Sequence, residues 1–170
     1  MDLKVQSNFL DKSEWDYVID KTLHSKNWAF FGTSASDENF TFWGMDLKSD
    51  LFFSDFFLKK IESVYNKKFK LSRVYANGQT YGLPGSLHTD NGEDVDNTFL
   101  YYVGPEWNLE WGGHTVFHDI KTNMVHNQLP VPNTGILFDS DILHVGMEPT
   151  RHCKTLRVSI AFKMKEIGEL

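Results

Sequence analysis

The sequence contains little cysteine: Cys153 is the only one among 170 residues. A single cysteine excludes an internal disulfide and a zinc cage of four cysteines, and it favours a reducing compartment. Nowhere do roughly 18 apolar residues run together, which excludes an ordinary membrane-spanning helix. The first residues also lack a basic stretch followed by a long apolar one. We therefore expect a soluble, cytoplasmic protein without a membrane partner.

The chain also has no excess of basic residues, since its formal net charge is −6. Nucleic-acid binding usually requires a basic patch or stripe, so no nucleic-acid partner is expected. The short basic runs Lys59-Lys60 and Lys67-Lys68 fall in a helix-like stretch and indicate a solvated face. A hydrophobic content of 41% with 15% aromatics is typical of a globular protein rather than a disordered one.

No repeat, low-complexity tract or flexible linker divides the chain, so one domain spanning residues 1–170 is expected. Residues 1–70 contain two helix-like stretches around one strand-like segment, residues 40–47. Asp11 or Ser13 is expected to cap the first helix, and Ser49 or Asp50 the second. The second helix carries an apolar stripe expected to pack in the core, made of Phe53, Phe56, Phe57, Ile61 and Val64.

From residue 71 to residue 164 the pattern changes to short runs of strand-forming residues separated by turn residues. The segment NGQTYGLPGS and the segment NGEDVDN are expected to be turns. Several short strands at regular spacing indicate a β-sandwich or barrel. Helices first and strands second predict a mainly β, α+β fold, in which N-terminal helices cover one face of a β core.

The segment LHTD brings together two possible metal ligands. Alternate side chains of a strand point the same way, so His88 and Asp90 face one point while Thr89 faces the other side. Taken by itself, this tripeptide favours an exposed turn that enters NGED. His144, which lies 56 residues later, supplies a third ligand. Two histidines and one carboxylate are typical of non-haem Fe(II) oxygenases, although zinc is also chemically possible.

A strand-like run with an arginine at its start follows the last of these residues. Arg157 lies 13 residues after His144, and Ser159 shares its strand face. A buried arginine is costly unless it meets an anion, and its planar fork suits a carboxylate. This predicts that a carboxylate ligand binds beside the metal.

These motifs together resemble the 2-oxoglutarate- and Fe(II)-dependent dioxygenases, and among them the prolyl 4-hydroxylase-like group. The resemblance runs from about Leu71 to Met164 and covers a little over half the chain. It implies a double-stranded β-helix, or cupin-like jelly roll. It further implies that His88, Asp90 and His144 bind Fe(II), and that Arg157 binds the distal carboxylate of 2-oxoglutarate.

The same resemblance extends to the strand TFLYYV and the turns after it. It implies that Tyr102 donates a hydrogen bond to 2-oxoglutarate while Tyr101 faces the other side, and that Ser159 assists Arg157. Ser159 can also be read simply as a small strand residue. The spacing from His144 to the arginine is longer than in the animal oxygen-sensing enzymes, which leaves Arg151 and Lys154 as rivals for this role.

Other chemistry-bearing residues are interpreted more conservatively. Tyr75 and Tyr81 are candidates for contact with substrate or cosubstrate, and Trp107 and Trp111 for either core packing or substrate stacking. Asp139 and Asp141 could orient His144, although their position favours a turn role. The remaining histidines are expected to be structural or solvated, namely His24, His114, His118, His126 and His152.

The resemblance implies an enzyme that uses Fe(II), 2-oxoglutarate and O₂, with ascorbate as a possible addition. It would hydroxylate a C–H bond, in a prolyl residue of a peptide or protein, and release succinate and CO₂. A free amino acid or another small metabolite is an alternative substrate. A non-catalytic, metal-binding cupin-like module is the alternative of another class, because one fold can host many functions.

Overall fold

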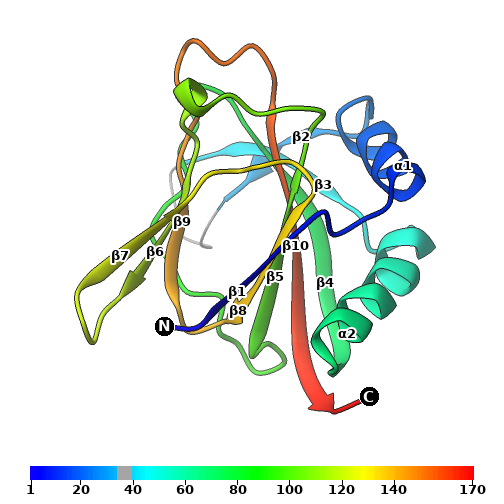
Figure 1. Ribbon diagram of the computed structural model, residues 1–170. Helices are drawn as coiled ribbons and strands as arrows, with labels where there is room; N and C mark the ends of the chain where they lie inside the picture. Colours follow the sequence, from blue (N-terminus) through cyan, green and yellow to red (C-terminus); the bar gives the residue numbers. More distant parts are fainter. Residues whose placement is uncertain (34–39) are drawn as a thin grey trace.

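The computed structural model describes residues 1–33 and 40–170, which form two antiparallel β-sheets with helices on one side (Figure 1). The major sheet has seven strands in the order β1-β8-β5-β10-β4-β3-β2. The minor sheet has three strands in the order β7-β6-β9. This is the mainly β, jelly-roll-like fold that the sequence predicted.

The strands of the major sheet are β1 (Leu3–Ser7), β2 (Ala29–Gly32), β3 (Phe42–Asp46), β4 (Lys68–Gln79), β5 (Asn97–Val103), β8 (Thr134–Asp139) and β10 (Arg157–Gly168). Those of the minor sheet are β6 (Thr115–Asp119), β7 (Met124–Gln128) and β9 (Leu143–Gly146). The helical elements are α1 (Lys12–Thr22), a π-helical segment η1 (Phe52–Phe57), α2 (Leu58–Tyr65) and a 3₁₀ turn η2 (Leu109–Trp111). Among the described residues, these helices are too short and too polar to cross a membrane.

The two faces of the major sheet differ in what covers them. Figure 1 shows α1 and α2 together on the side of β4 and β10, whereas β6, β7 and β9 lie on the opposite side. Even-numbered residues of β10, such as Val158, Ile160 and Phe162, join the core beneath the helices, together with Phe53 and Phe57. The odd-numbered residues of β10 therefore face the minor sheet, because side chains alternate along a strand. The candidate site lies on that second face.

Local structure follows the sequence closely in the first helix and less closely in the second. Asp11 caps α1 in a complete capping box, in which its side chain accepts from the Glu14 backbone N–H at 2.9 Å. The second helix was predicted as one α-helix, but its first six residues are π-helical. Fewer residues of the expected apolar stripe are buried than the sequence predicted. Phe53, Phe57 and Ile61 are buried, whereas Phe56 and Val64 are exposed.

Two strand predictions need correction around the candidate site. The segment NGQTYGLPGS was expected to be a turn, but Asn77–Gln79 continue β4, because all three residues pair with β10 and the first two also pair with β3. The LHTD segment was expected to be a strand end, whereas only one isolated bridge, between His88 and His144, holds it. The extra length of β4 places Gln79 opposite Arg157 in the sheet.

Candidate metal centre

Three side chains from separate parts of the chain converge between the two sheets. His144 lies on β9, and His88 pairs with it through two backbone hydrogen bonds of 3.0 and 2.9 Å. Asp90 follows two residues later, and its backbone N–H donates to Ser140 O at 2.7 Å. One ligand atom from each of the three residues lies within 4.8 Å of the others. Within the described ranges, this is the only such group of histidine, cysteine and acidic residues.

Hydrogen bonds fix how both imidazole rings present their nitrogens. His88 Nδ1 lies 2.8 Å from Ser86 O, and His144 Nδ1 lies 2.9 Å from Ile142 O. A carbonyl oxygen only accepts, so each Nδ1 carries the proton and each Nε2 is left with its lone pair. Burial lowers the pKa of His144 to about 4, so its ring is neutral at neutral pH. Neutral imidazole is the form that binds a metal.

The carboxylate of Asp90 is anchored through one of its two oxygens. Oδ2 accepts a hydrogen bond of 2.8 Å from Thr98 Oγ1 and an ion pair from Lys163. Oδ1 faces His88 Nε2 at 3.4 Å. Burial by itself raises the pKa of Asp90, but the neighbouring side chains of His88 and Lys163 outweigh it and hold the pKa far below its usual range. Asp90 is therefore an ionised ligand that lies beside both histidines, with Oδ1 facing His88 and Oδ2 lying 3.4 Å from His144 Nε2.

This donor set fits the metal that the sequence suggested. The two Nε2 lone pairs and a carboxylate oxygen converge on one point, an arrangement that is unfavourable unless a cation lies between them. Two imidazoles and one carboxylate on a single face suit Fe(II) and leave coordination positions open for other ligands. The backbone carbonyls that hold both Nδ1 atoms supply the outer-shell orientation that metal-bound histidines require.

Arg157 opens β10 and is only 1% exposed. Its Nε donates to Gly113 O, its Nη1 to Gln79 Oε1 at 2.8 Å and its Nη2 to Thr115 Oγ1 at 2.9 Å. All three acceptors are neutral, and no acidic side chain pairs with the guanidinium among the described residues. Burial lowers the pKa of Arg157 from its ordinary value, yet an arginine remains a cation in proteins. A buried cation without a counter-charge indicates an anionic ligand.

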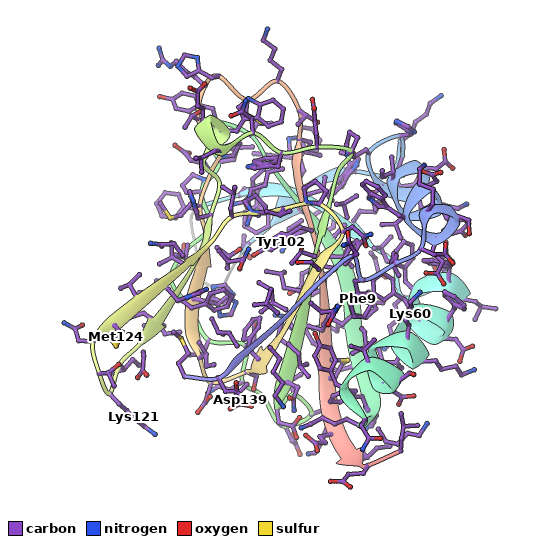
Figure 2. The ribbon with its side chains drawn as sticks, viewed as in Figure 1. Phe9, Lys60, Tyr102, Lys121, Met124 and Asp139 are labelled. Carbon is purple, nitrogen blue, oxygen red and sulfur yellow. The ribbon has the colours of Figure 1, made fainter. Side chains whose placement is uncertain are left out.

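The two neighbouring tyrosines face opposite sides of β5, as the resemblance implied. Tyr101 donates to Asn133 Oδ1 at 3.0 Å on the helix side, and Tyr102 donates to Thr115 Oγ1 at 2.7 Å on the side of the minor sheet. Figure 2 shows Tyr102 in the interior of the molecule. Its ring lies 5.8 Å from the Arg157 guanidinium carbon. Tyr102 thus lies behind Arg157, and its hydroxyl is already engaged.

A pocket connects the candidate metal ligands with Arg157. His88 and His144 line one part of it, and Arg157 and Ser159 line another. Its volume is about 50 Å³.

Several pocket residues were not predicted from the sequence. Thr98 and Lys163 hold Asp90, and Gln79 and Thr115 hold Arg157. Lys163 could have been found from strand alternation, since Arg157, Ser159, Ala161 and Lys163 are two residues apart in turn and all line the pocket. Tyr75, which was predicted as a contact, also lines the pocket.

The other candidates lie away from this pocket. Arg151 and Lys154 are exposed, and Arg151 stacks over the Tyr81 ring at 5.1 Å. Trp107 and Trp111 pack edge to face at 5.3 Å outside the pocket. Asp139 and Asp141 are exposed, and the Ile142 carbonyl orients His144 in their place. The remaining histidines also lie outside the pocket. His118 is bonded elsewhere, His114 is half-buried, and three are exposed, namely His24, His126 and His152.

Comparisons with known proteins agree with this geometry. The 2OG-Fe(II) oxygenase superfamily profile matches residues 71–163. No curated protein sequence matches the chain. Among solved structures, the chain is similar to a Trichoplax adhaerens prolyl hydroxylase in complex with a hypoxia inducible factor oxygen degradation domain peptide fragment. Identity is 18%, coverage 96% of this chain and 83% of that one, and the TM-score 0.75.

Two further structures show the same fold. A Pseudomonas putida prolyl-4-hydroxylase is 13% identical, with 96% of this chain and 92% of that chain covered and a TM-score of 0.74. A viral collagen prolyl hydroxylase from Paramecium Bursaria Chlorella virus-1, in a 2OG complex, is 16% identical. Coverage is 97% of this chain and 96% of that one, and the TM-score is 0.64. At these identities the likeness concerns the fold.

Proposed function

Because the chain belongs to the 2OG-Fe(II) oxygenase superfamily, we propose that it hydroxylates a C–H bond of a prolyl residue in a peptide or protein. Members of this family are oxidoreductases that use Fe(II), 2-oxoglutarate and O₂. The observation that carries the proposal is one pocket lined both by His88 and His144, which form a ligand set with Asp90, and by the unpaired cation of Arg157.

Different residues of this chain would bind the metal and 2-oxoglutarate. His88 and His144 would bind the metal through Nε2, and Asp90 through Oδ1, since Oδ2 is held by Thr98 and Lys163. Arg157 would hold the distal carboxylate of 2-oxoglutarate, with Ser159 beside it on the same strand face. A metal bound here would supply the redox chemistry by which 2-oxoglutarate, O₂ and R–H become succinate, CO₂ and R–OH. One oxygen atom of O₂ would enter succinate and the other the substrate.

The neighbours above support a prolyl residue in a peptide as the substrate, because they include prolyl hydroxylases and one of these binds a peptide. The surface near the site also suits an extended chain. Exposed Phe30 and Phe40 form a shallow groove with residues 82–84, in the loop that leads to His88. A free amino acid or other small metabolite is the second candidate, and the buried cation Lys163 favours it because such molecules carry a carboxylate.

The first test is 2-oxoglutarate binding by an arginine variant and its matched control. Arg157→Met should weaken metal-dependent, anaerobic 2-oxoglutarate binding roughly ten- to a hundredfold, because charge-assisted hydrogen bonds contribute about 1.5–3 kcal/mol. Arg151→Met removes an exposed arginine outside the pocket and should leave that affinity unchanged. Isothermal titration with Mn(II) in place of iron measures both. Equal affinity in the wild type and Arg157→Met would refute the role of Arg157 in cosubstrate binding, and no metal-dependent binding in either protein would favour a metal-binding module without cosubstrate.

The second measurement concerns the product. Incubation with Fe(II), ascorbate, 2-oxoglutarate and a library of proline-containing peptides should release succinate and add one oxygen atom to proline, which mass spectrometry detects. Free amino acids tested in parallel distinguish the second candidate. Succinate release with neither class of substrate, together with no metal-dependent 2-oxoglutarate binding, would contradict the enzyme assignment for this chain.

A further inference from the structure

Lys163 is a buried lysine in the middle of the candidate site. Its side chain is 3% exposed, and its Nζ pairs with Asp90 Oδ2 and lies 3.5 Å from Thr98 Oγ1. The Nζ also lies 5.9 Å from the centre of the Tyr75 ring. A lysine is rarely fully buried unless it is paired. Its position on the pocket-facing side of β10, and not on the surface, therefore needs an explanation beyond strand packing.

The balance of charges in the pocket provides an explanation for the buried lysine. The residues around it include two cations, Arg157 and Lys163, whereas Asp90 is the one carboxylate in contact with either of them among the described residues. A divalent metal and the dianionic 2-oxoglutarate add equal and opposite charges. One positive charge therefore remains unmatched inside the protein after both have bound, which is unfavourable in a buried pocket.

The two cations are well separated along β10. Arg157 and Lys163 are six residues apart, which corresponds to about 20 Å between Cα atoms at about 3.3 Å per residue. Arg157 is tied to Gln79, Gly113 and Thr115, whereas Lys163 is tied to the metal ligand Asp90. An anion held by Arg157 therefore does not reach Lys163, which lies at the metal end with Asp90 as its one charged partner among the described residues.

The two cations also differ in how they are held. Three hydrogen bonds hold the guanidinium of Arg157, whereas Lys163 ends in a compact ammonium on a flexible four-carbon stem. Its main attraction is to Asp90. A divalent metal on Asp90 Oδ1 draws the carboxylate's charge away from Lys163 and repels the ammonium. The ammonium can then turn toward a ligand in the pocket.

We propose that the substrate presents a carboxylate to Lys163, so that the enzyme prefers a substrate with an anionic group close to the C–H bond that reacts. This rests on the proposed function and narrows its substrate class. A free amino acid, a peptide that ends in proline, and a peptide with an acidic residue beside proline all offer this carboxylate. A peptide with an internal proline and no acidic neighbour lacks it.

A binding experiment tests the lysine without relying on turnover. The protein is loaded anaerobically with Mn(II) and 2-oxoglutarate and titrated by calorimetry with N-acetyl-L-proline or with its uncharged amide. The wild type should bind the acid at least about tenfold more tightly than the amide. Lys163→Met should reduce this ratio to about one. Lys165→Met, which changes a half-buried lysine outside the pocket two residues further along β10, should keep it.

A second variant distinguishes the loss of the charge from a loss of folding. Lys163→Gln removes the charge but keeps a hydrogen-bond donor for Asp90, and Mn(II) binding shows whether the metal site is intact. It should also lose the preference for the acid. If either variant binds Mn(II) and still prefers the acid as strongly as the wild type, Lys163 serves only to hold Asp90 and the proposal is wrong. A loss of 2-oxoglutarate affinity as large as in Arg157→Met would instead make Lys163 a cosubstrate ligand and also overturn it.

Succinate release then identifies the source of the carboxylate. The four substrates are free L-proline, acetyl-Ala-Pro with a free carboxylate, the same peptide as its amide, and acetyl-Asp-Pro amide. The substrates with a carboxylate should react at least about tenfold faster than acetyl-Ala-Pro amide, and the fastest identifies the source. Equal rates for all four would refute the proposal. If none of the four is oxidised, the prolyl function fails. Calorimetry with the acid and the amide of N-acetylated amino acids other than proline then still tests whether Lys163 binds a carboxylate.

Discussion

Two buried threonines on neighbouring strands of the major sheet lead to opposite predictions at the scale of single residues. Thr98 on β5 donates to the ionised Asp90, whereas Thr134 Oγ1 on β8 is buried without a hydrogen-bond partner among the described residues. Thr98→Val should lower the free energy of unfolding of the metal-free protein by about 1.5–3 kcal/mol, the value of a hydrogen bond to a charged group. Thr134→Val removes an unpaired hydroxyl of nearly the same shape and should be neutral or stabilising by about 1 kcal/mol.

Urea denaturation of both variants and the wild type measures the two changes under identical conditions. Because valine replaces threonine in both, differences in β-propensity and side-chain volume largely cancel. Equal losses of stability in the two variants would show that the hydroxyl of Thr98 is not what anchors Asp90.

The residues that the sequence revealed are those whose chemistry is unusual for their position. His88, Asp90 and His144 were found because two histidines and a carboxylate form a recognisable set, and Arg157 because a strand-like run opens with a cation. Lys163 was missed because the end of RVSIAFKM is also compatible with an exposed lysine. Whether it faces the pocket depends on the pairing of β10 with β4 and β5, which is set by residues far away in sequence.

At the scale of elements, the N-terminal cap of α1 links local sequence to the packing of both helices. Asp11 accepts from Glu14 N, Glu14 accepts from Asp11 N, and Glu14 also pairs with Lys60 of α2. Asp11→Ala should therefore lower the thermal unfolding midpoint at pH 7. The Glu14 backbone N–H and the Ser13 hydroxyl lower the pKa of Asp11 below its ordinary value of 3.8. The folded state thus favours the ionised carboxylate, and this contribution is present above about pH 4 and disappears as the pH falls through the lowered pKa.

The corresponding measurement is a series of thermal melts from pH 7 to pH 2. The difference between the wild type and Asp11→Ala should shrink steadily below pH 4. Asp16→Ala, which removes a carboxylate from the exposed middle of α1, is the control and should change the midpoint less at pH 7. A gap that stays constant down to pH 2 would assign the effect to something other than the ionised cap.

Local signals account for the elements that were predicted well. The first helix has a capping residue and an apolar stripe, and β5 and β10 have uninterrupted strand-forming residues. The π-helical start of the second helix follows from no local rule, because Phe52, Phe53, Phe56 and Phe57 can all pack as α-helical residues. Their packing against the underlying sheet, including Phe57 against Phe99 at 6.1 Å, selects the wider turn. Long-range packing also extends β4 through residues that read as a turn.

At the scale of the whole molecule, the composition and the order of helices and strands were enough to predict a mainly β fold with helices on one face. The order of strands in the two sheets was beyond local reasoning, because β10 is the last strand in sequence and pairs with β4 and β5 in the middle of the major sheet. This central position gives the final strand its role in the site. It carries Arg157 and Lys163 at the two ends of one pocket.

The candidate metal centre joins the two sheets, and this leads to a prediction about overall stability. His144 belongs to β9 of the minor sheet, and Asp90 is tied through Thr98 and Lys163 to β5 and β10 of the major sheet. A metal bound here should therefore stabilise the folded chain as a unit. At a free concentration a hundred times the dissociation constant, binding contributes about 2.7 kcal/mol. In a domain of this size that corresponds to a rise of about 5–10 °C in the midpoint of thermal unfolding.

Thermal melts with and without Co(II), a divalent ion that can stand in for iron, measure this shift. His144→Ala should abolish it, because one of three ligands is lost. His118→Ala removes an exposed histidine that is bonded to Asn123 and should retain it in full. Adding 2-oxoglutarate should raise the midpoint further in the metal-loaded wild type and not in the metal-loaded Arg157→Met. If His144→Ala keeps the Co(II) shift while His118→Ala loses it, the metal binds on the minor sheet alone and does not join the two sheets.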